Sequence, residues 1–167
     1  MASLKADFDE LLERIRRGRE LNHASFEPIY YLVFSPRQIV EVKRMMSAWM
    51  SRLHNEGWQV VEVPVADVLY EFLGNAKLRK FWLSADEKAP LAWDKTNQSL
   101  ANALTKGEVL QNALASELAT LEGVENALLI VNDLEALHPY MRIGTIESSL
   151  QGKFSVPTVF LYPGTRV

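Results

Sequence analysis

Two short apolar runs near the end of the chain, Leu128–Val131 and Val156–Leu161, constrain its fold more than any other feature. A polar, helix-like segment separates them. Two such runs with a helical crossover between them predict a βαβ unit, the element that builds a parallel sheet. Asn132-Asp133 follows the first run and Tyr162-Pro163-Gly164-Thr165 ends the second. Because open α/β sheets bind ligands at the carboxyl ends of their strands, these two junctions are the first places to look for function.

The composition is that of an ordinary globular domain. The 167 residues are 48% hydrophobic and 23% charged, which predicts one domain, residues 1–167, able to bury a core without staples. A net charge of −3 gives no general electrostatic reason to bind nucleic acid or an anionic membrane. The absence of cysteine excludes a disulfide framework, a thiol nucleophile and a cysteine zinc site. With neither a signal peptide nor about 18 consecutive apolar residues to span a membrane, we expect a cytoplasmic protein.

The N-terminal segment predicts an amphipathic helix over residues ~4 to ~20, capped by Ser3. Its arginines are Arg14, Arg16, Arg17 and Arg19. In a functional interpretation, these arginines contact an anion or DNA. The favoured alternative is that they complement the helix dipole and solvate its face, because the acids Asp7, Asp9, Glu10 and Glu13 share the helix.

Residues 28–34 are a continuous β-branched and aromatic run, which predicts a first strand buried on both faces. Ser35-Pro36-Arg37-Gln38 then has the pattern of a capping box and predicts a helix running to about Glu56. A nucleotide-binding phosphate loop would lie at this junction, but the turn is short and has neither glycine nor lysine. Arg37 is a further candidate anion contact. The favoured interpretation is that its side chain is simply solvated.

The rest of the chain alternates strand and helix. The pattern predicts a strand at Val60–Val63, a helix at 65–80 and a long or broken helix at 97–121. Trp82 and Trp93 lie in the irregular connection between the two helices. One interpretation is that they anchor a partner protein. The favoured interpretation is that both pack into a small satellite core. This order predicts a three-layer α/β/α fold with a mainly parallel sheet.

Motifs for catalysis are missing. Leu128–Asp133 has the form of the strand whose aspartate holds Mg²⁺ in nucleotide hydrolases, but without a phosphate loop Asp133 and Glu135 have no triphosphate to act on. Glu135 and His138 make one i, i+3 pair, too few ligands for a metal. The one Glu-x-Lys sequence, Glu41–Lys43, falls on a predicted helix and not on a nuclease strand. The residues therefore predict no catalytic site, no metal and no cofactor.

The segments HPYMRIG (138–144), LQGK (150–153), VP (156–157) and YPGTR (162–166) resemble BrxB, the small B component of bacteriophage-exclusion (BREX) defence systems. The resemblance extends more loosely over the whole chain. It implies a bacterial phage-resistance protein that has no catalytic activity of its own. The implied role is a protein-interaction adaptor of PglZ, the large alkaline-phosphatase-like component, in an assembly that also has a methyltransferase and an AAA+ ATPase.

The resemblance also implies a fold similar to a degenerate P-loop or AAA-type core that has lost its phosphate loop. Family members usually continue past the Tyr-Pro-Gly segment into a further strand and a glycine-containing tail. The resemblance therefore implies that either the chain is trimmed or a terminal strand beyond residue 167 is missing. The candidate partner contacts are the signature residues that packing does not obviously need: His138, Tyr140, Arg142, Tyr162 and Arg166. Two alternatives stay open, a nucleotide-sensing or ATP-binding domain that uses Asp133 and a DNA-binding accessory that uses the N-terminal arginines.

Overall fold

The computed structural model describes residues 3–21, 28–75, 98, 99, 101–103, 108–137, 148, 150 and 154–164. In chain order, the helices and strands in these residues are α1 (Leu4–Leu21), β1 (Ile29–Phe34), a 3-10 turn η1 (Pro36–Gln38), α2 (Ile39–Asn55), β2 (Gln59–Pro64), α3 (Val65–Asn75), α6 (Val109–Leu121), β3 (Ala127–Asn132), a 3-10 turn η2 (Leu134–Leu137) and β4 (Thr158–Pro163). The predicted segments at 81–93 and 138–147, with Trp82 and Trp93, lie outside the described residues.

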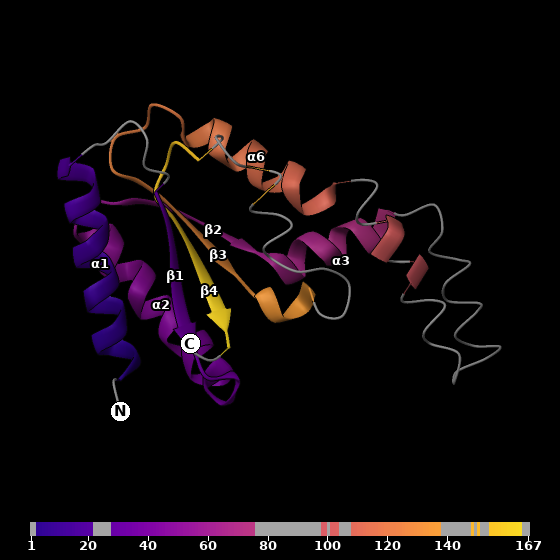
Figure 1. Cartoon of the computed structure of the whole chain (residues 1–167), viewed down its shortest axis with the longest axis horizontal. Coiled ribbons are helices and arrows are strands. Elements are labelled where there is room, and N and C mark those ends of the chain that lie inside the picture. Colours follow the sequence, from indigo (N-terminus) through magenta and orange to yellow (C-terminus); the bar gives the residue numbers. More distant parts are fainter. Residues whose placement is uncertain are drawn as a thin grey trace.

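The four strands form one parallel sheet in the order β1-β4-β3-β2 (Figure 1). The two apolar runs are its central strands: β3 and β4 pair directly, with Ile130 opposite Val159. All six residues of β3 are buried, which explains its unbroken apolar sequence. The second run begins two residues later than predicted, because the strand starts at Thr158, after Pro157. The predicted mixed α/β fold with a parallel sheet is confirmed.

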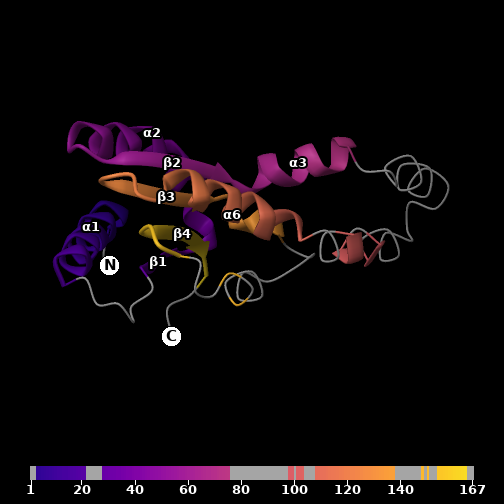
Figure 2. The same ribbon diagram turned by 90° about the horizontal axis from the view of Figure 1, so that it is seen from above.

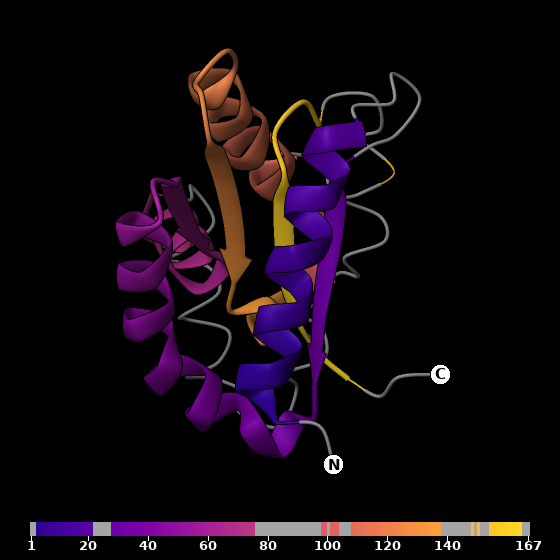
Figure 3. The same cartoon turned by 90° about the vertical axis from the view of Figure 1, so that its left-hand side faces the viewer.

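Helices cover both faces of the sheet. In Figure 3, α1 and α2 lie in front of the strands and α6 lies behind them, and Figure 2 shows the same arrangement from above. The core is accordingly divided in two. The α1/α2 face buries Phe8, Ile15, Trp49, Leu53, Trp58, Leu128, Ile130, Val159 and Leu161. The opposite face buries Val65, Leu110, Leu114, Leu118, Leu129, Val131, Leu134, Leu137 and Phe160.

One prediction about the sheet is wrong. Strand β1 is not buried on both faces, because it lies at the end of the observed strand order and Tyr31 keeps 38% of its surface exposed. Its aromatic and β-branched composition suits a half-buried strand as well as a fully buried one. Strand β1 buries Leu32 and Phe34 against α1 and α2, and Tyr31 lies on the other face.

Candidate functional site

The candidate site lies at the edge of the sheet where the carboxyl ends of all four parallel strands meet. The chain leaves β1 into η1 and α2, on one face, and leaves β3 into η2, which packs in the core of the opposite face. Strand β4 lies between these two strands. Connections that diverge to opposite faces define a topological switch point, where open α/β sheets form their ligand crevice. We call this place, between residues 35–38 and residues 133–135, the switch crevice, after the position that a ligand crevice takes in such sheets.

On the β1 side of the switch crevice, the backbone amides are occupied within the turn itself. Ser35 Oγ accepts the Arg37 N–H at 3.3 Å, Gln38 Oε1 accepts the Ser35 N–H at 3.1 Å, and the Ser35 carbonyl accepts the Gln38 N–H at 2.8 Å. Pro36 has no N–H to offer. The predicted capping box is thereby confirmed. Phosphate loops bind phosphate with backbone N–H groups, and this turn leaves none between Ser35 and Gln38.

On the β3 side, Asn132 organises the strand end. Its side chain is buried, and its Nδ2 donates to Glu62 Oε1 on β2 at 2.8 Å. Its Oδ1 accepts the backbone N–H of Asp133 at 2.7 Å. Asp133 has a φ of 62°, in the left-handed region that aspartate tolerates better than most residues. Asn132 therefore links β2 to β3 and fixes the turn that presents Asp133.

A lysine from α2 crosses the switch crevice to these carboxylates. Lys43 Nζ lies 2.9 Å from Glu135 Oε1 and 3.4 Å from Asp133 Oδ1. The Asp133 and Glu135 side chains are only 16% and 30% exposed, whereas that of Lys43 is 50% exposed. Contact with the Glu135 carboxylate raises the pKa of Lys43, aided by the charge of Asp133 and opposed by partial burial. Lys43 is thus the counter-ion of two partly desolvated acids.

Sequence reasoning missed this contact. The Glu41–Lys43 pair does lie on a helix, as predicted, but Lys43 faces the acidic strand end and not an unrelated surface. The available signal was its position: Lys43 follows the start of α2 by about one turn, and α2 begins at the carboxyl end of β1. Within the described ranges, no group of three or more His, Cys, Asp or Glu side chains has the arrangement of a metal site.

Of the five predicted partner contacts, the structure describes Tyr162 alone. His138, Tyr140, Arg142 and Arg166 lie outside the described residues. Tyr162 is 38% exposed and meets Tyr31 edge to face, with ring centroids 6.4 Å apart. Tyr31 stacks in turn on the buried Phe160, at 5.5 Å. The Tyr162 ring folds over Gly164, where a Cβ atom would lie 2.6 Å from its Cε1. Two half-exposed tyrosines therefore form a fixed aromatic pair on β1 and β4.

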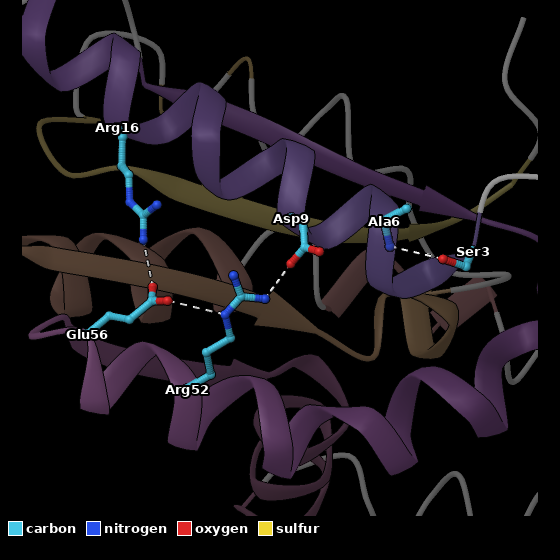
Figure 4. Close-up of polar contacts among 6 residues, drawn as sticks. All are labelled: Ser3, Ala6, Asp9, Arg16, Arg52 and Glu56. Carbon is cyan, nitrogen blue, oxygen red and sulfur yellow. Dashed lines mark hydrogen bonds and ion pairs between the residues drawn. The ribbon is translucent and has the colours of Figure 1, made fainter.

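The predicted arginine cluster is paired with acids. Arg14 and Arg17 bind Glu10 and Glu13 one turn earlier, at 2.8 and 3.5 Å. Arg16 reaches from α1 to Glu56 at the end of α2, at 2.8 Å (Figure 4). Arg19 lies in the last turns of α1, and its side chain is outside the described part. Arg37 is exposed on η1.

Glu56 is part of a network that joins α1 to α2. Arg52 binds Glu56 at 3.3 Å and also the carboxylate of Asp9, as Figure 4 shows. Exposed ion pairs of this kind contribute about 0–1 kcal/mol each to the stability of the fold. Their main effect is that these arginines already have acidic partners.

Comparison of the chain with protein-family models, curated proteins and solved structures finds no match. Among the described residues, no helix has both the length and the apolar character needed to cross a membrane.

Proposed function

We propose that this chain is a non-catalytic protein-binding component of a BREX-type phage-defence system, and that its partner is a PglZ-type protein. The switch-crevice turn carries the proposal. Every N–H from Ser35 to Gln38 is either bonded within the turn or absent at Pro36. A phosphate group entering here has no backbone donor to meet, although this is where an open α/β sheet most often binds one. The resemblance to BrxB supplies the defence context and the partner.

The charge arrangement on the other side of the crevice supports the same proposal. In nucleotide hydrolases, the aspartate at such a strand end holds a Mg²⁺ ion that is bound to the phosphates. Here Asp133 and Glu135 have Lys43 as their counter-ion, at 3.4 and 2.9 Å. The polar groups of the crevice are thus satisfied by the chain itself. They stabilise the turns that follow β1 and β3 and are not displayed for a small molecule.

The aromatic pair of Tyr31 and Tyr162 is the described surface best suited to a protein partner. Tyrosine is enriched in interface hot spots because its ring buries a large area and its hydroxyl remains polar. Both rings are 38% exposed and are held in place by Phe160 and by each other. A rigid aromatic surface loses little conformational entropy on binding. Tyr162 is also one of the signature residues that the sequence predicts as partner contacts.

Co-purification with the PglZ-type protein of the same locus tests the proposal. We expect the two proteins to elute together in size-exclusion chromatography at micromolar concentrations. Tyr162→Ala should weaken the complex, while Tyr70→Ala, which removes an 81% exposed tyrosine on α3, should not. Separate elution of the two folded proteins would remove the proposal's main support.

The two alternatives make opposite predictions. A nucleotide-sensing domain that uses Asp133 requires saturable, Mg²⁺-dependent ATP binding that Asp133→Ala abolishes in calorimetry. A DNA-binding accessory requires salt-dependent retention on DNA that falls when Arg14, Arg16 and Arg17 are replaced. The ion pairs of these arginines with Glu10, Glu56 and Glu13 weigh against the second alternative, because phosphate must compete with them.

A further inference from the structure

Lys43 joins two elements that leave the sheet in opposite directions. Helix α2 belongs to the core on one face, while Leu134 and Leu137 of η2 belong to the core on the other. The Nζ atom of Lys43 spans the carboxyl edge between them and lies 2.9 Å from Glu135 and 3.4 Å from Asp133. These ion pairs therefore bridge the switch crevice itself, and are not confined to one helix surface as the Arg14–Glu10 pair is.

The acidic side of this bridge is the fixed side. Asp133 follows a fully buried strand, has a φ of 62°, and donates its N–H to the buried side chain of Asn132. Glu135 Oε1 is shielded from solvent, and the ammonium of Lys43, 2.9 Å away, is its partner. Lys43 itself is half exposed on a flexible four-carbon stem. The lysine is thus the part of the bridge that is able to move.

We propose that Lys43 is a built-in counter-cation, here called the latch, that occupies the cation position of the switch crevice. Its ammonium takes the space between Asp133 and Glu135 where a divalent cation would have to bind, so the crevice accepts an external cation only when Lys43 is withdrawn. The chemistry of the competing ligand follows from the donors, because carboxylate oxygens are the groups that Mg²⁺ and Mn²⁺ prefer. The proposal concerns the crevice alone and does not depend on a PglZ-type partner.

The burial of the acids makes this bridge different from an ordinary surface ion pair. A carboxylate that is 16% or 30% exposed has lost much of its hydration, and leaving it without a cation is costly. If Lys43 is removed, the two acids lose their counter-cation. At neutral pH and with a divalent ion in solution, binding the ion satisfies both carboxylates at once.

Titration with Mn²⁺, followed by its electron paramagnetic resonance signal, tests the latch. We compare the wild type with Lys43→Met, which removes the ammonium, and with Lys43→Arg, which keeps a positive charge. Arg44→Met is the matched control, because it removes the same charge from the next, exposed position of α2. We expect Lys43→Met to bind Mn²⁺ about tenfold more tightly than the wild type, Lys43→Arg and Arg44→Met. The reason is that Lys43→Met lacks the positive charge that repels Mn²⁺ from the two partly buried carboxylates. Adding Asp133→Asn to Lys43→Met should abolish the gain.

Two results would overturn the latch. One is a wild type that binds Mn²⁺ as tightly as Lys43→Met. The other is an equal gain in Arg44→Met, which would show an effect of net charge and not of the bridge.

If Lys43→Met fails to fold, acetylation of the wild type by an activated ester, read by mass spectrometry, replaces it. We then expect Lys43 to react several-fold more slowly than the exposed Lys5 and to speed up in Glu135→Gln. Equal rates at Lys43 and Lys5 would reject the bridge.

Discussion

Phe8 of α1 and Trp49 of α2 stack face to face, with ring centroids 4.5 Å apart and planes inclined by 13°. Both side chains are about 95% buried, and the guanidinium of Arg52 lies over the Phe8 ring at 5.8 Å. This contact joins the N-terminal helix to α2 within the core on one face of the sheet. It places α1 and α2 together on one face, and it leaves Asp9 within reach of Arg52.

Replacing Phe8 by alanine should therefore loosen α1. Truncation of a buried Phe removes its transfer free energy and leaves a cavity, so we expect the free energy of unfolding to fall by about 3–5 kcal/mol. Denaturant titration followed by circular dichroism measures this. Tyr70→Ala, at an 81% exposed position, should stay within about 0.5 kcal/mol of the wild type. Equal losses in the two variants would mean that α1 does not pack as described.

Asn132→Asp tests the polar link between β2 and β3. The change keeps an acceptor for the Asp133 N–H but replaces the donor to Glu62, 2.8 Å away, with a second carboxylate. We expect a loss of about 1–3 kcal/mol in denaturant unfolding, because a buried donor is lost and like charges meet. Asn55→Asp makes the same charge change at an exposed position of α2 and should cost much less. A stable Asn132→Asp protein would contradict the link.

The pH dependence of stability should report on Lys43 in the alkaline range. Its pKa is raised above 10.5, mainly by the Glu135 carboxylate, so the folded chain holds this proton more tightly than the unfolded chain. The resulting stabilisation is complete below that value and is lost as the pH rises through the folded pKa. Burial raises the pKa of Tyr30 above 10.0 and acts in the same direction.

The experiment separates the two groups by working in a Tyr30→Phe background. We expect the free energy of unfolding of Tyr30→Phe to fall as the pH rises from 9 through the alkaline range. Tyr30→Phe combined with Lys43→Met should fall less over the same range. Parallel curves for the two proteins would show that Lys43 has no raised pKa.

Gly164→Ala tests how the tyrosine pair is held. The new Cβ atom would lie 2.6 Å from Tyr162 Cε1, so the ring must leave its rotamer, at a cost of about 0.5–1.5 kcal/mol. We expect shifted Tyr162 and Tyr31 ring resonances and a weaker complex with the partner. Gly74→Ala, in α3 with no atom within 4 Å of the new Cβ, should instead stabilise the protein slightly. Unchanged ring resonances in Gly164→Ala would contradict the packing described for Tyr162.

The parts of the fold that depend on local sequence were predictable. The capping box at Ser35–Gln38 and the cap at Ser3 each follow from residues close together in the chain. The adjacent central strands β3 and β4 follow from the two short apolar runs. The strand order could not be predicted from the sequence. For this reason the strand that contains Tyr31 was expected to be buried on both faces, although it lies at the end of the observed strand order.

The contacts of the candidate site depend on tertiary structure. The position of Lys43, about one turn into the helix that follows β1, indicates the edge of the sheet at which it lies. That it meets Asp133 and Glu135 there, about 90 positions later, depends on the strand order. The partners of Arg16 and Arg52 are likewise set by how α1 crosses α2, which helical periodicity does not determine. Sequence patterns locate the carboxyl edge of the sheet, and only the assembled layers show that its acids already have a cation.

The central claim is that the chain acts by binding a protein and not a nucleotide, and calorimetry tests it most directly. The same wild-type preparation is titrated with the PglZ-type protein of its locus and, separately, with ATP and Mg²⁺. The account predicts saturable binding of the protein, weakened by Tyr162→Ala, and no heat of binding for ATP. Saturable ATP binding that Asp133→Ala abolishes, together with no heat for the PglZ-type protein, would contradict it.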